Sequence, residues 1–382
     1  MSLIKLTYSE FDGEPQYWSI SDTTFININL IVGKNSSGKS RLLSIINSFA
    51  ELLSGQRKIP PTPSRFSVDL VLDKKTFSYE LVFGSKGVSS EILTIDGTEK
   101  LIRNEDGSGK IFYQKENKFL DFKLPQDALA TVNRRDEIQH PFLIELNKWA
   151  NSTVIYLFGS DFGKSEILGI TEAKDFFNNP NTPISHNPRN LVKVYSSAFS
   201  KYGEGFDKAI LSDMNKLGYS LSEVGCDNLQ EHVPFPIPAL GIFVVENNVN
   251  CKIFQMNISQ GMFRALALVI HLNLCSFSKT KQLIIIDDIG EGLDYERAVS
   301  IIELLIIKAK DNDFQLIMTS NDRFVMNKVP LEYWSVLKRK GSLVNMYNSR
   351  NSEKKFNDFK FLGLNNFDFF ASDFLDAKGS NE

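Results

Sequence analysis

The stretch Gly33-Lys34-Asn35-Ser36-Ser37-Gly38-Lys39-Ser40 decides the fold of this chain. It fits the pattern G-x-x-x-x-G-K-[ST] at every fixed position. Ahead of it, residues 25–32 alternate with the period of a strand, and behind it apolar residues recur at helical spacing from Leu42 to Leu53, until Gly55. Strand, glycine loop and helix in this order are the context that a phosphate-binding P-loop requires.

The residue types of this loop suit a polyphosphate. Glycines let backbone N–H groups wrap around phosphates, and the helix that follows turns its positive end toward them. We expect the Lys39 ammonium to reach the β- and γ-phosphates and the Ser40 hydroxyl to ligate Mg²⁺. The sequence therefore predicts a site for a nucleoside triphosphate, with ATP and Mg²⁺ as cofactors, built by Gly33, Asn35, Ser36, Ser37, Gly38, Lys39 and Ser40.

Composition places the chain among ordinary globular proteins. Of its 382 residues, 42% are hydrophobic and 23% are charged, enough for two or three domains or one large domain with insertions. The net charge of −3 gives no basic field that would indicate a nucleic-acid protein. The short run Lys338-Arg339-Lys340 is interpreted as a solvated hairpin tip.

Cysteine usage and the N-terminal sequence bear on the compartment. The three cysteines are odd in number and far apart, which favours a reducing environment over a disulfide framework. The sequence starts with strand-like residues and shows neither a signal-peptide pattern nor an apolar run of ~20 residues. A cytoplasmic protein without a membrane partner is expected.

The order of patterns along the chain indicates an α/β fold. Strands are expected at 3–11 and 16–20, followed after the first helix by a β-meander with Gly-containing turns up to about residue 114. Helical patterns follow from about residue 127, including one amphipathic helix over 199–217. We therefore expect an N-terminal ATPase lobe with the β-subdomain (1–125), a helical insertion lobe (126–239) and a C-terminal ATPase lobe with a Phe-rich tail (240–382).

A second nucleotide-related motif lies in the C-terminal half. Leu283–Asp288 is an apolar, buried-type strand that ends in two carboxylates, the pattern of a Walker B element. An acid at such a strand end can hold Mg²⁺ through its water shell, and we assign this role to Asp287. Asp288, one residue further, is predicted to act on the attacking water as a base or orienter.

Ser259-Gln260-Gly261 opens a long apolar helix, with Arg264 following in its first turn. With these motifs the chain resembles the ABC/SMC/RecF class of ATPases, whose signature is Ser-x-Gly-x-x-Arg before a helix. The resemblance implies that Ser259 and Gly261 cap the γ-phosphate of ATP bound by another protomer. A plain helix N-cap is the alternative role for this triplet.

Two further segments carry this resemblance. Gly292-Leu293-Asp294 matches the D-loop of the class, and Asn321, after the predicted strand 314–318, stands at its switch position. The amino-acid sequences of Ile258–Gly261 and Asp287–Asp294 are also similar to those of stand-alone, ABC-like members of the AAA group. These include the heads of overcoming-lysogenisation-defect nucleases and the ATPase subunits of bacterial anti-phage systems.

Departures from the class pattern predict slow turnover. The class has Glu directly after the Walker B Asp, where this chain has the shorter Asp288; Glu291 is the alternative catalytic carboxylate. Asn321 replaces the usual switch His and can donate a hydrogen bond but cannot carry a proton at neutral pH. The catalytic candidates are therefore Asp288, Glu291 and Asn321.

The sequence leaves the roles of two other residues undecided. Trp18 either stacks on adenine or belongs to the core, and Gln139 fits the Gln-bearing loop of the class only by its order in the chain. No heptad pattern is sustained between the two halves, which indicates a compact ABC-type head without a long coiled coil.

The resemblance implies a homodimer or higher homo-oligomer joined through ATP. It also implies a role as a sensor or gate for a separately encoded toxin or nuclease in anti-phage defence, because no nuclease motif is present in this chain. The alternative is a RecF-like repair or recombination ATPase that binds duplex DNA. A third hypothesis is a nucleotide-bound scaffold that does not hydrolyse ATP.

Overall fold

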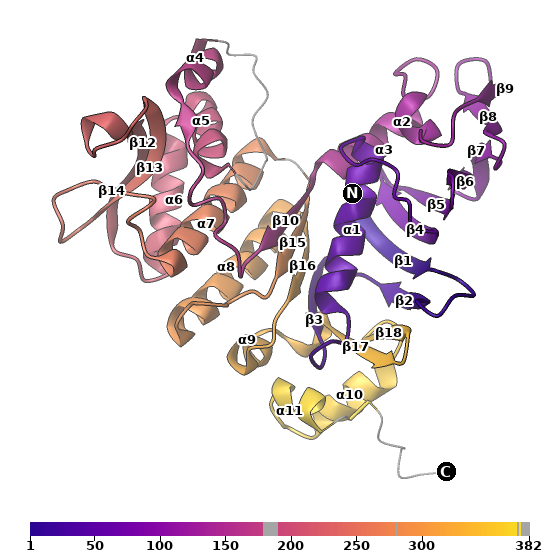
Figure 1. The fold of residues 1–382 in the computed structure, drawn as a ribbon. Coiled ribbons are helices and arrows are strands. Elements are labelled where there is room, and N and C mark those ends of the chain that lie inside the picture. The colour runs from indigo at the N-terminus through magenta and orange to yellow at the C-terminus, as the bar shows by residue number, and fades with distance from the viewer. Residues whose placement is uncertain (179–189, 280, 373, 376–382) are drawn as a thin grey trace. The chain divides into compact units, whose positions relative to one another are not determined.

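The chain folds into two compact units (Figure 1). The structure, a computed structural model, describes residues 1–178, 190–279, 281–372 and 374–375. Unit 1 comprises Met1–Thr153, Gln282–Ile285 and Phe314–Glu382, and unit 2 comprises Val154–Lys281 and Ile286–Asp313. Part of the predicted helical insertion, residues 179–189, lies outside the described residues.

A parallel group of strands forms the centre of unit 1. Strand β3 (Ile28–Val32) pairs in parallel with β16 (Gln315–Thr319) on one side and with β17 (Trp334–Lys340) on the other. The first residues of β15 (Leu283–Asp287) lie beside β16. Every residue of β3 is buried, as expected for a strand covered on both faces.

An extension continues this sheet beyond β17, with β18 and β2 paired in parallel and the neighbours from β2 to β9 paired antiparallel. The strand order runs β17-β18-β2-β1-β4 and then through β5 to β9 in sequence order (Figure 1). The predicted meander is confirmed, and a last strand that the sequence reading missed, β9, is added. The bounds are β1 Ser2–Glu10, β2 Trp18–Thr24, β4 Ser64–Leu72, β5 Lys75–Gly84, β6 Gly87–Ile95, β7 Thr98–Arg103, β8 Ser108–Tyr113, β9 Lys118–Lys123 and β18 Leu343–Asn348.

Helix α1 (Lys39–Ser54) buries an apolar face and lies across the sheet (Figure 1). Its Phe49 ring lies 5.5 Å from the Phe66 ring of β4 and 6.0 Å from the Trp149 ring of α3 (Pro141–Asn151). As the sequence indicates, the helix ends at Gly55, whose φ of 85° places it in the left-handed region that favours glycine.

A buried ion pair fastens the meander to the short helix α2 (Ala130–Asn133). Glu91 of β6 accepts hydrogen bonds from the Ala130 and Thr131 N–H groups, both at 2.8 Å. The guanidinium of Arg103 lies 3.6 Å from the Glu91 carboxylate and donates to the Pro125 carbonyl at 2.7 Å. Because the charges are paired and hydrogen-bonded, their burial is tolerated.

The density of Phe residues after Asn351 predicts a segment that docks against the ATPase core, and the tail does fold back onto unit 1. Helices α10 (Glu353–Phe361) and α11 (Asn366–Ala371) follow the last strand, β18, whereas the short helix α9 (Arg323–Lys328) lies between β16 and β17 (Figure 1). The Phe369 ring packs 4.7 Å from Phe356 and 6.5 Å from Trp334. Phe361, the last residue of α10, is different, since it is 89% exposed.

Unit 2 is built around helix α7 (Gln260–Ser278), with α5 (Leu191–Tyr202), α6 (Glu204–Lys216) and α8 (Tyr295–Asn312) packed against it or one another. A small antiparallel sheet completes this unit, with the strands β11 Leu168–Gly169, β12 Leu221–Asn228, β13 Ala239–Glu246 and β14 Ile253–Phe254. Two short elements lie outside this sheet: strand β10 Thr153–Leu157, which pairs with β15, and helix α4 Ile170–Asn178. Helix α7 is long and apolar enough to cross a bilayer by composition, but most of it is buried in this unit, as in the core helix of a globular protein.

One sequence prediction in unit 2 is wrong. The single helix expected over 199–217 is two helices, α5 and α6, that meet at Gly203. Gly203 has φ 60° and ψ −151°, a conformation that interrupts the helical backbone and that glycine adopts without a steric penalty. The Asn247-Asn248 pair between two strand-like runs predicts a strand pair, and the structure has it as β13 and β14.

A buried polar cluster joins three helices of unit 2. Asp213 of α6 is 3% exposed, accepts a hydrogen bond from Asn273 of α7 at 2.9 Å and lies 2.7 Å from the Lys308 ammonium of α8. Burial by itself raises the pKa of Asp213, but the contacts with Lys308 and Asn273 outweigh it and hold the pKa below its usual range. The carboxylate is therefore charged and paired at neutral pH.

Candidate nucleotide-binding site

The loop Gly33–Gly38 joins β3 to α1 within unit 1, in the strand-loop-helix arrangement that the sequence predicts. Ser36 and Gly38 have φ values of 64° and 103°. Non-glycine residues rarely adopt positive φ, and such conformations gather at binding loops. The Ser37 N–H donates to the Lys34 carbonyl at 3.1 Å, which closes a tight turn.

Both motif glycines lie where a side chain would collide or strain the backbone. A Cβ atom on Gly33 would collide with the Ser37 hydroxyl and lie 3.0 Å from the Leu337 carbonyl. A Cβ on Gly38 would lie 3.4 Å from the Trp18 ring, in addition to its unfavourable φ. The close packing explains why the loop needs glycine at these two positions.

The groups that line the loop fit a triphosphate. The buried Lys39 ammonium donates to the Gly33 carbonyl at 2.8 Å, so that the positive charge is held inside the loop. The Ser37 hydroxyl is buried and has no hydrogen-bond partner among the described residues. A buried polar atom without a partner, a cation and the N-terminus of a 16-residue helix together are a donor set for an anion.

Ser40 is exposed in the first turn of α1, next to Lys39. Its hydroxyl is therefore accessible for the metal role that the sequence assigns to it. Asn35 and Ser36 are exposed on the outer side of the loop.

Trp18 belongs to the core. The side chain is 3% exposed, the Arg41 guanidinium lies 3.9 Å from its ring centroid, and Arg41 also pairs with Glu10. Of the two interpretations that the sequence left open, burial favours the core aromatic over an adenine platform.

The end of β17 lies against the P-loop. Arg339 donates to the Ser36 carbonyl at 3.1 Å and to the Gly341 carbonyl at 2.7 Å. The basic run 338–340 therefore forms the end of a strand and the start of its hairpin turn, and one of its members contacts the nucleotide loop. A hollow of about 160 Å³ beside it is lined by Lys34, Val336, Leu337, Lys338, Arg339, Phe369, Phe370 and Leu375.

Asn321 emerges at the same sheet edge as the P-loop. Strands β16 and β3 are parallel, with Thr319 opposite Ile31, so both chains leave the sheet in the same direction. Asn321 is exposed and directly precedes Asp322, which caps α9 by accepting from the Phe324 N–H at 2.7 Å. Unit 1 thus carries the P-loop and the switch position together.

Asp287 and Asp288 lie at the end of β15, in unit 2. The Asp287 carbonyl accepts a hydrogen bond from the Phe158 N–H at 3.0 Å, which ties it to the segment after β10. Asp288 has a φ of 52°, and its carbonyl accepts from the Glu291 N–H at 3.2 Å. The chain therefore turns sharply at Asp288. Asp287 still has the extended backbone of the strand, whereas the backbone of Asp288 is in the left-handed region.

Ser259 caps helix α7. Its hydroxyl accepts a hydrogen bond from the Met262 N–H at 3.3 Å, so Ser259 is the N-cap of this helix. This role does not conflict with phosphate binding, because the remaining N–H groups of the first turn still point outward. A Cβ on Gly261 would lie 3.0 Å from the Gly292 carbonyl, which places the signature segment directly against the D-loop.

Glu291 directly precedes the D-loop, and Asp294 is its last residue. The exposed Glu291 carboxylate lies over Gly159, where an added Cβ would be 2.5 Å from its oxygen. Asp294 caps α8 by accepting a hydrogen bond from the backbone N–H of Arg297 at 3.0 Å. This hydrogen bond and a second one from the Arg297 side chain lower the pKa of Asp294.

Sequence reasoning missed the loop after β10, Gly159-Ser160. This loop lies between Glu291 and Arg264 in unit 2, and its carbonyls accept hydrogen bonds from the Arg264 guanidinium. No sequence motif marks this loop. The sequence signal for it was Arg264, a charged residue in an otherwise apolar helix, which needs hydrogen-bond acceptors once it is buried. Gln139 lies elsewhere, in unit 1, where its carbonyl accepts from the Gln114 N–H at 3.0 Å.

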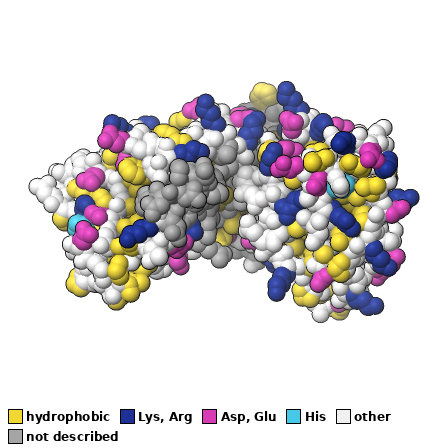
Figure 2. Space-filling model, turned by 90° about the horizontal axis from the view of Figure 1, so that it is seen from above, with side chains coloured by type: hydrophobic (Ala, Val, Ile, Leu, Met, Phe, Trp, Pro, Cys, Tyr) yellow, Lys and Arg dark blue, Asp and Glu magenta, His cyan; other side chains and the backbone are white. Residues whose placement is uncertain are grey.

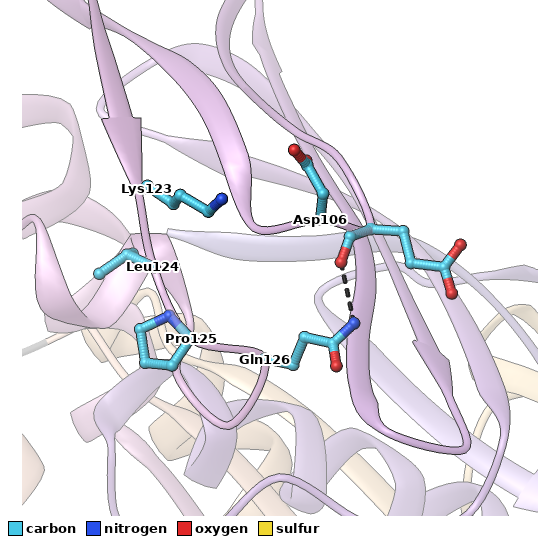
Figure 3. A pocket seen from close by; sticks show the side chains of 6 residues that line it. Asp106, Lys123, Leu124, Pro125 and Gln126 are labelled. Atoms are coloured by element: carbon cyan, nitrogen blue, oxygen red, sulfur yellow. Dashed lines mark hydrogen bonds between the residues drawn. The ribbon is translucent and has the colours of Figure 1, made fainter.

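A larger hollow, of about 550 Å³, opens on the meander and is lined by Glu105, Asp106, Lys123, Leu124, Pro125 and Gln126 (Figure 3). The Gln126 amide donates to the Glu105 carbonyl at 2.8 Å across it. Hydrogen bonds from Ser108 lower the pKa of Asp106, so this carboxylate stabilises its own turn. The hollow contains none of the predicted site residues.

The P-loop, its strand-loop-helix context and the head-like fold define a P-loop ATPase of the ABC/SMC class. The profile of the family described as "AAA domain, putative AbiEii toxin, Type IV TA system" matches residues 28–327, and the chain belongs to this family. The matched range includes the P-loop, the signature segment, Asp287-Asp288 and Asn321. No curated protein matches the chain.

Solved structures of SMC heads share the fold. The structure of an "SmcHead bound to the C-winged helix domain of ScpA" is 14% identical, covers 91% of this chain and 97% of its own, and gives a TM-score of 0.55. The Smc head with an extended coiled coil bound to the C-terminal domain of ScpA from Pyrococcus furiosus is 12% identical, covers 94% and 99%, and gives a TM-score of 0.51. At such low identity the likeness concerns the fold. The expected ABC-type head is thereby confirmed.

Proposed function

We propose that this protein is a slow ATPase whose copies assemble by holding ATP between them. The observation that supports this most directly is the P-loop itself, with a buried ammonium, a buried hydroxyl without a partner and a helix N-terminus arranged around one loop. Gly33, Asn35, Ser36, Ser37, Gly38, Lys39 and Ser40 bind the triphosphate of one copy in this proposal. Ser259 and Gly261 of another copy complete the site.

Mg²⁺ is assigned to the Ser40 hydroxyl and the Asp287 carboxylate, whose oxygen atoms suit this hard cation. A Mg²⁺ ion held by these two residues would supply positive charge beside the phosphates. Asp288 orients or deprotonates the attacking water, with Glu291 as the second candidate, and Asn321 donates a hydrogen bond toward the γ-phosphate.

Slow turnover follows from two residue types. Asp288 is one methylene shorter than the Glu of related ATPases, and the neutral amide of Asn321 cannot donate and recover a proton. We expect turnover well below the enzyme median of about 10 per second. In such a protein the occupancy of the site by ATP, rather than the flux through it, carries the signal.

The biological role in this proposal is to sense a trigger or gate a separately encoded toxin or nuclease in anti-phage defence. The family description, which refers to a toxin–antitoxin system, supports this role. All three cysteines are free, which is consistent with the cytoplasm as the place of action. Co-expression with the product of the neighbouring gene tests the role; toxicity that depends on Lys39 is the expected result, and a neighbouring gene of DNA repair would argue for another role.

A RecF-like function on duplex DNA is the second candidate, because the basic run 338–340 contacts the P-loop through Arg339. Against it, Lys and Arg side chains are interspersed with Asp and Glu on the face drawn in Figure 2, and the net charge is −3. ATP-dependent binding to duplex DNA that weakens steeply with salt is the result that would favour this candidate.

A further inference from the structure

We infer that Arg264 is a positioning residue that holds the signature helix, the D-loop and the loop after β10 as one rigid piece, and that ATP-dependent assembly and turnover depend on it. The inference rests on the proposed function and deepens it. Arg264 belongs to unit 2, and the P-loop belongs to unit 1. Arg264 acts through the residues that it orients.

The guanidinium makes three hydrogen bonds to backbone carbonyls of two separate loops. Its Nε donates to Ser160 at 3.1 Å, its Nη2 to Gly159 at 3.0 Å and its Nη1 to Glu291 at 2.9 Å. The residue is 9% exposed, so water competes little for these carbonyls. Only a planar fork with several fixed N–H groups can serve carbonyls in this arrangement.

Three glycines bring the backbones close enough for this contact. A Cβ on Gly292, which has a φ of +77°, would lie 2.6 Å from the Arg264 guanidinium. Gly261 packs against the Gly292 carbonyl, and Gly159 packs under the Glu291 carboxylate. Side chains at these positions would push the loops apart, so the glycines and Arg264 form one fitted cluster.

The cluster continues into the carboxylates that are candidates for catalysis. The Phe158 N–H, directly before Gly159, donates to the Asp287 carbonyl at 3.0 Å, and the Glu291 N–H donates to the Asp288 carbonyl at 3.2 Å. Arg264 thus bonds the partner of Asp288, Glu291, directly, and it bonds Gly159, the residue next to Phe158, which is the partner of Asp287. A shift of the guanidinium therefore moves Asp288, Glu291 and the start of α7 together. In this way Arg264 links the candidate catalytic carboxylates to the signature segment at the start of α7, which in the proposed function completes the ATP site of another copy.

Arg264→Lys and Arg264→Met test this positioning role. Lysine keeps the charge but loses the fork, and methionine keeps the length without donors. We expect ATP affinity within about threefold of wild type, because the P-loop lies in unit 1, but at least a tenfold loss of turnover and loss of the ATP-induced increase in mass. Lys208→Ala, an exposed cation on α6 of the same unit, serves as the control and changes neither.

Hydrogen exchange separates positioning from general stability and needs no ATPase activity. Without nucleotide, both Arg264 variants should exchange faster at residues 158–161 and 288–293 while the amides of α1 and α6 keep their wild-type protection. A rise in exchange throughout unit 2 would assign Arg264 to stability alone. Gly292→Ala, which pushes on the guanidinium without removing it, should raise exchange in the same two segments.

The outcomes distinguish this inference from the proposed function. If wild type neither hydrolyses ATP nor assembles with it, the proposed function is wrong, and the exchange pattern still decides the role of Arg264. If wild type is active and Arg264→Met keeps turnover within twofold with unchanged exchange in both segments, the positioning role is wrong.

Discussion

The P-loop of unit 1 and the Arg264 cluster of unit 2 contrast in how they are built. The P-loop is one continuous stretch whose glycines, lysine and helix N-terminus follow each other in the chain. The cluster draws on three segments, at 158–161, 259–264 and 287–294, that come together only in the folded unit. The first is a local structure that the sequence specifies, and the second is a product of tertiary packing.

Because they are built differently, the two regions suit different functions. A contiguous loop with a fixed helix dipole can bind phosphate in a single copy. A cluster of three segments can shift as a body when one member is moved, which suits a region that must respond to a second copy. ATP affinity should therefore follow changes in unit 1, and assembly and turnover should follow changes in unit 2.

The largest effect is expected for Lys39→Ala. Loss of the ammonium removes a charge-assisted contact with the phosphates, and ATP affinity should fall by about 100-fold, with no measurable turnover. Isothermal titration with ATP measures this directly. Lys34→Ala, which removes an exposed cation of the same loop, is the matched control and should stay close to wild type; retained affinity in Lys39→Ala would overturn the site assignment.

Asp288→Ala should lower turnover by about 10²–10⁴-fold while ATP affinity is kept, because the residue acts on water rather than on binding. Phosphate release under single-turnover conditions measures the effect. Glu291→Ala is the comparison within the same turn, and we expect it to lose much less. The reverse ranking would assign the catalytic carboxylate to Glu291.

Ser259→Asp separates the two roles of Ser259. Aspartate is as good an N-cap as serine, so the thermal stability of unit 2 should be unchanged. Its negative charge should repel the γ-phosphate of ATP on another copy, and like charges brought together cost several kcal/mol. Light scattering should therefore show no ATP-induced mass increase. Assembly at wild-type level would leave Ser259 with the N-cap role alone.

The smallest functional effect is expected for Asp213→Ala, which should alter stability only. Breaking the buried contact with Lys308 should destabilise unit 2 by about 3 kcal/mol at pH 7 and leave ATP affinity unchanged. Because the folded-state pKa of Asp213 is lowered, its contribution is present above the unfolded pKa and is lost as the pH falls through the folded one. The difference from wild type in denaturant unfolding should shrink below about pH 4; a constant difference would contradict this.

The sequence could predict the parts of this protein that local chemistry determines. The P-loop, the buried strand before Asp287, the meander turns and the docked Phe-rich tail all carry their signals within a few residues. The break at Gly203 escaped because glycine inside an amphipathic pattern does not reveal its φ. Strand β9 and the loop at Gly159-Ser160 escaped because pairing and carbonyl acceptors are properties of the fold, and no side-chain pattern records them.

Mixing of two inactive variants tests whether the ATP site is shared between copies. Lys39→Ala lacks its own P-loop function, and Ser259→Asp cannot complete the site of another copy, so each should be inactive alone. Mixed before ATP is added, the two variants can form one intact site from the P-loop of one copy and the signature of the other. The account predicts that the mixture hydrolyses ATP although neither variant does. Full activity of Ser259→Asp alone, or a mixture as inactive as its parts although mass measurement shows mixed assemblies, would contradict it.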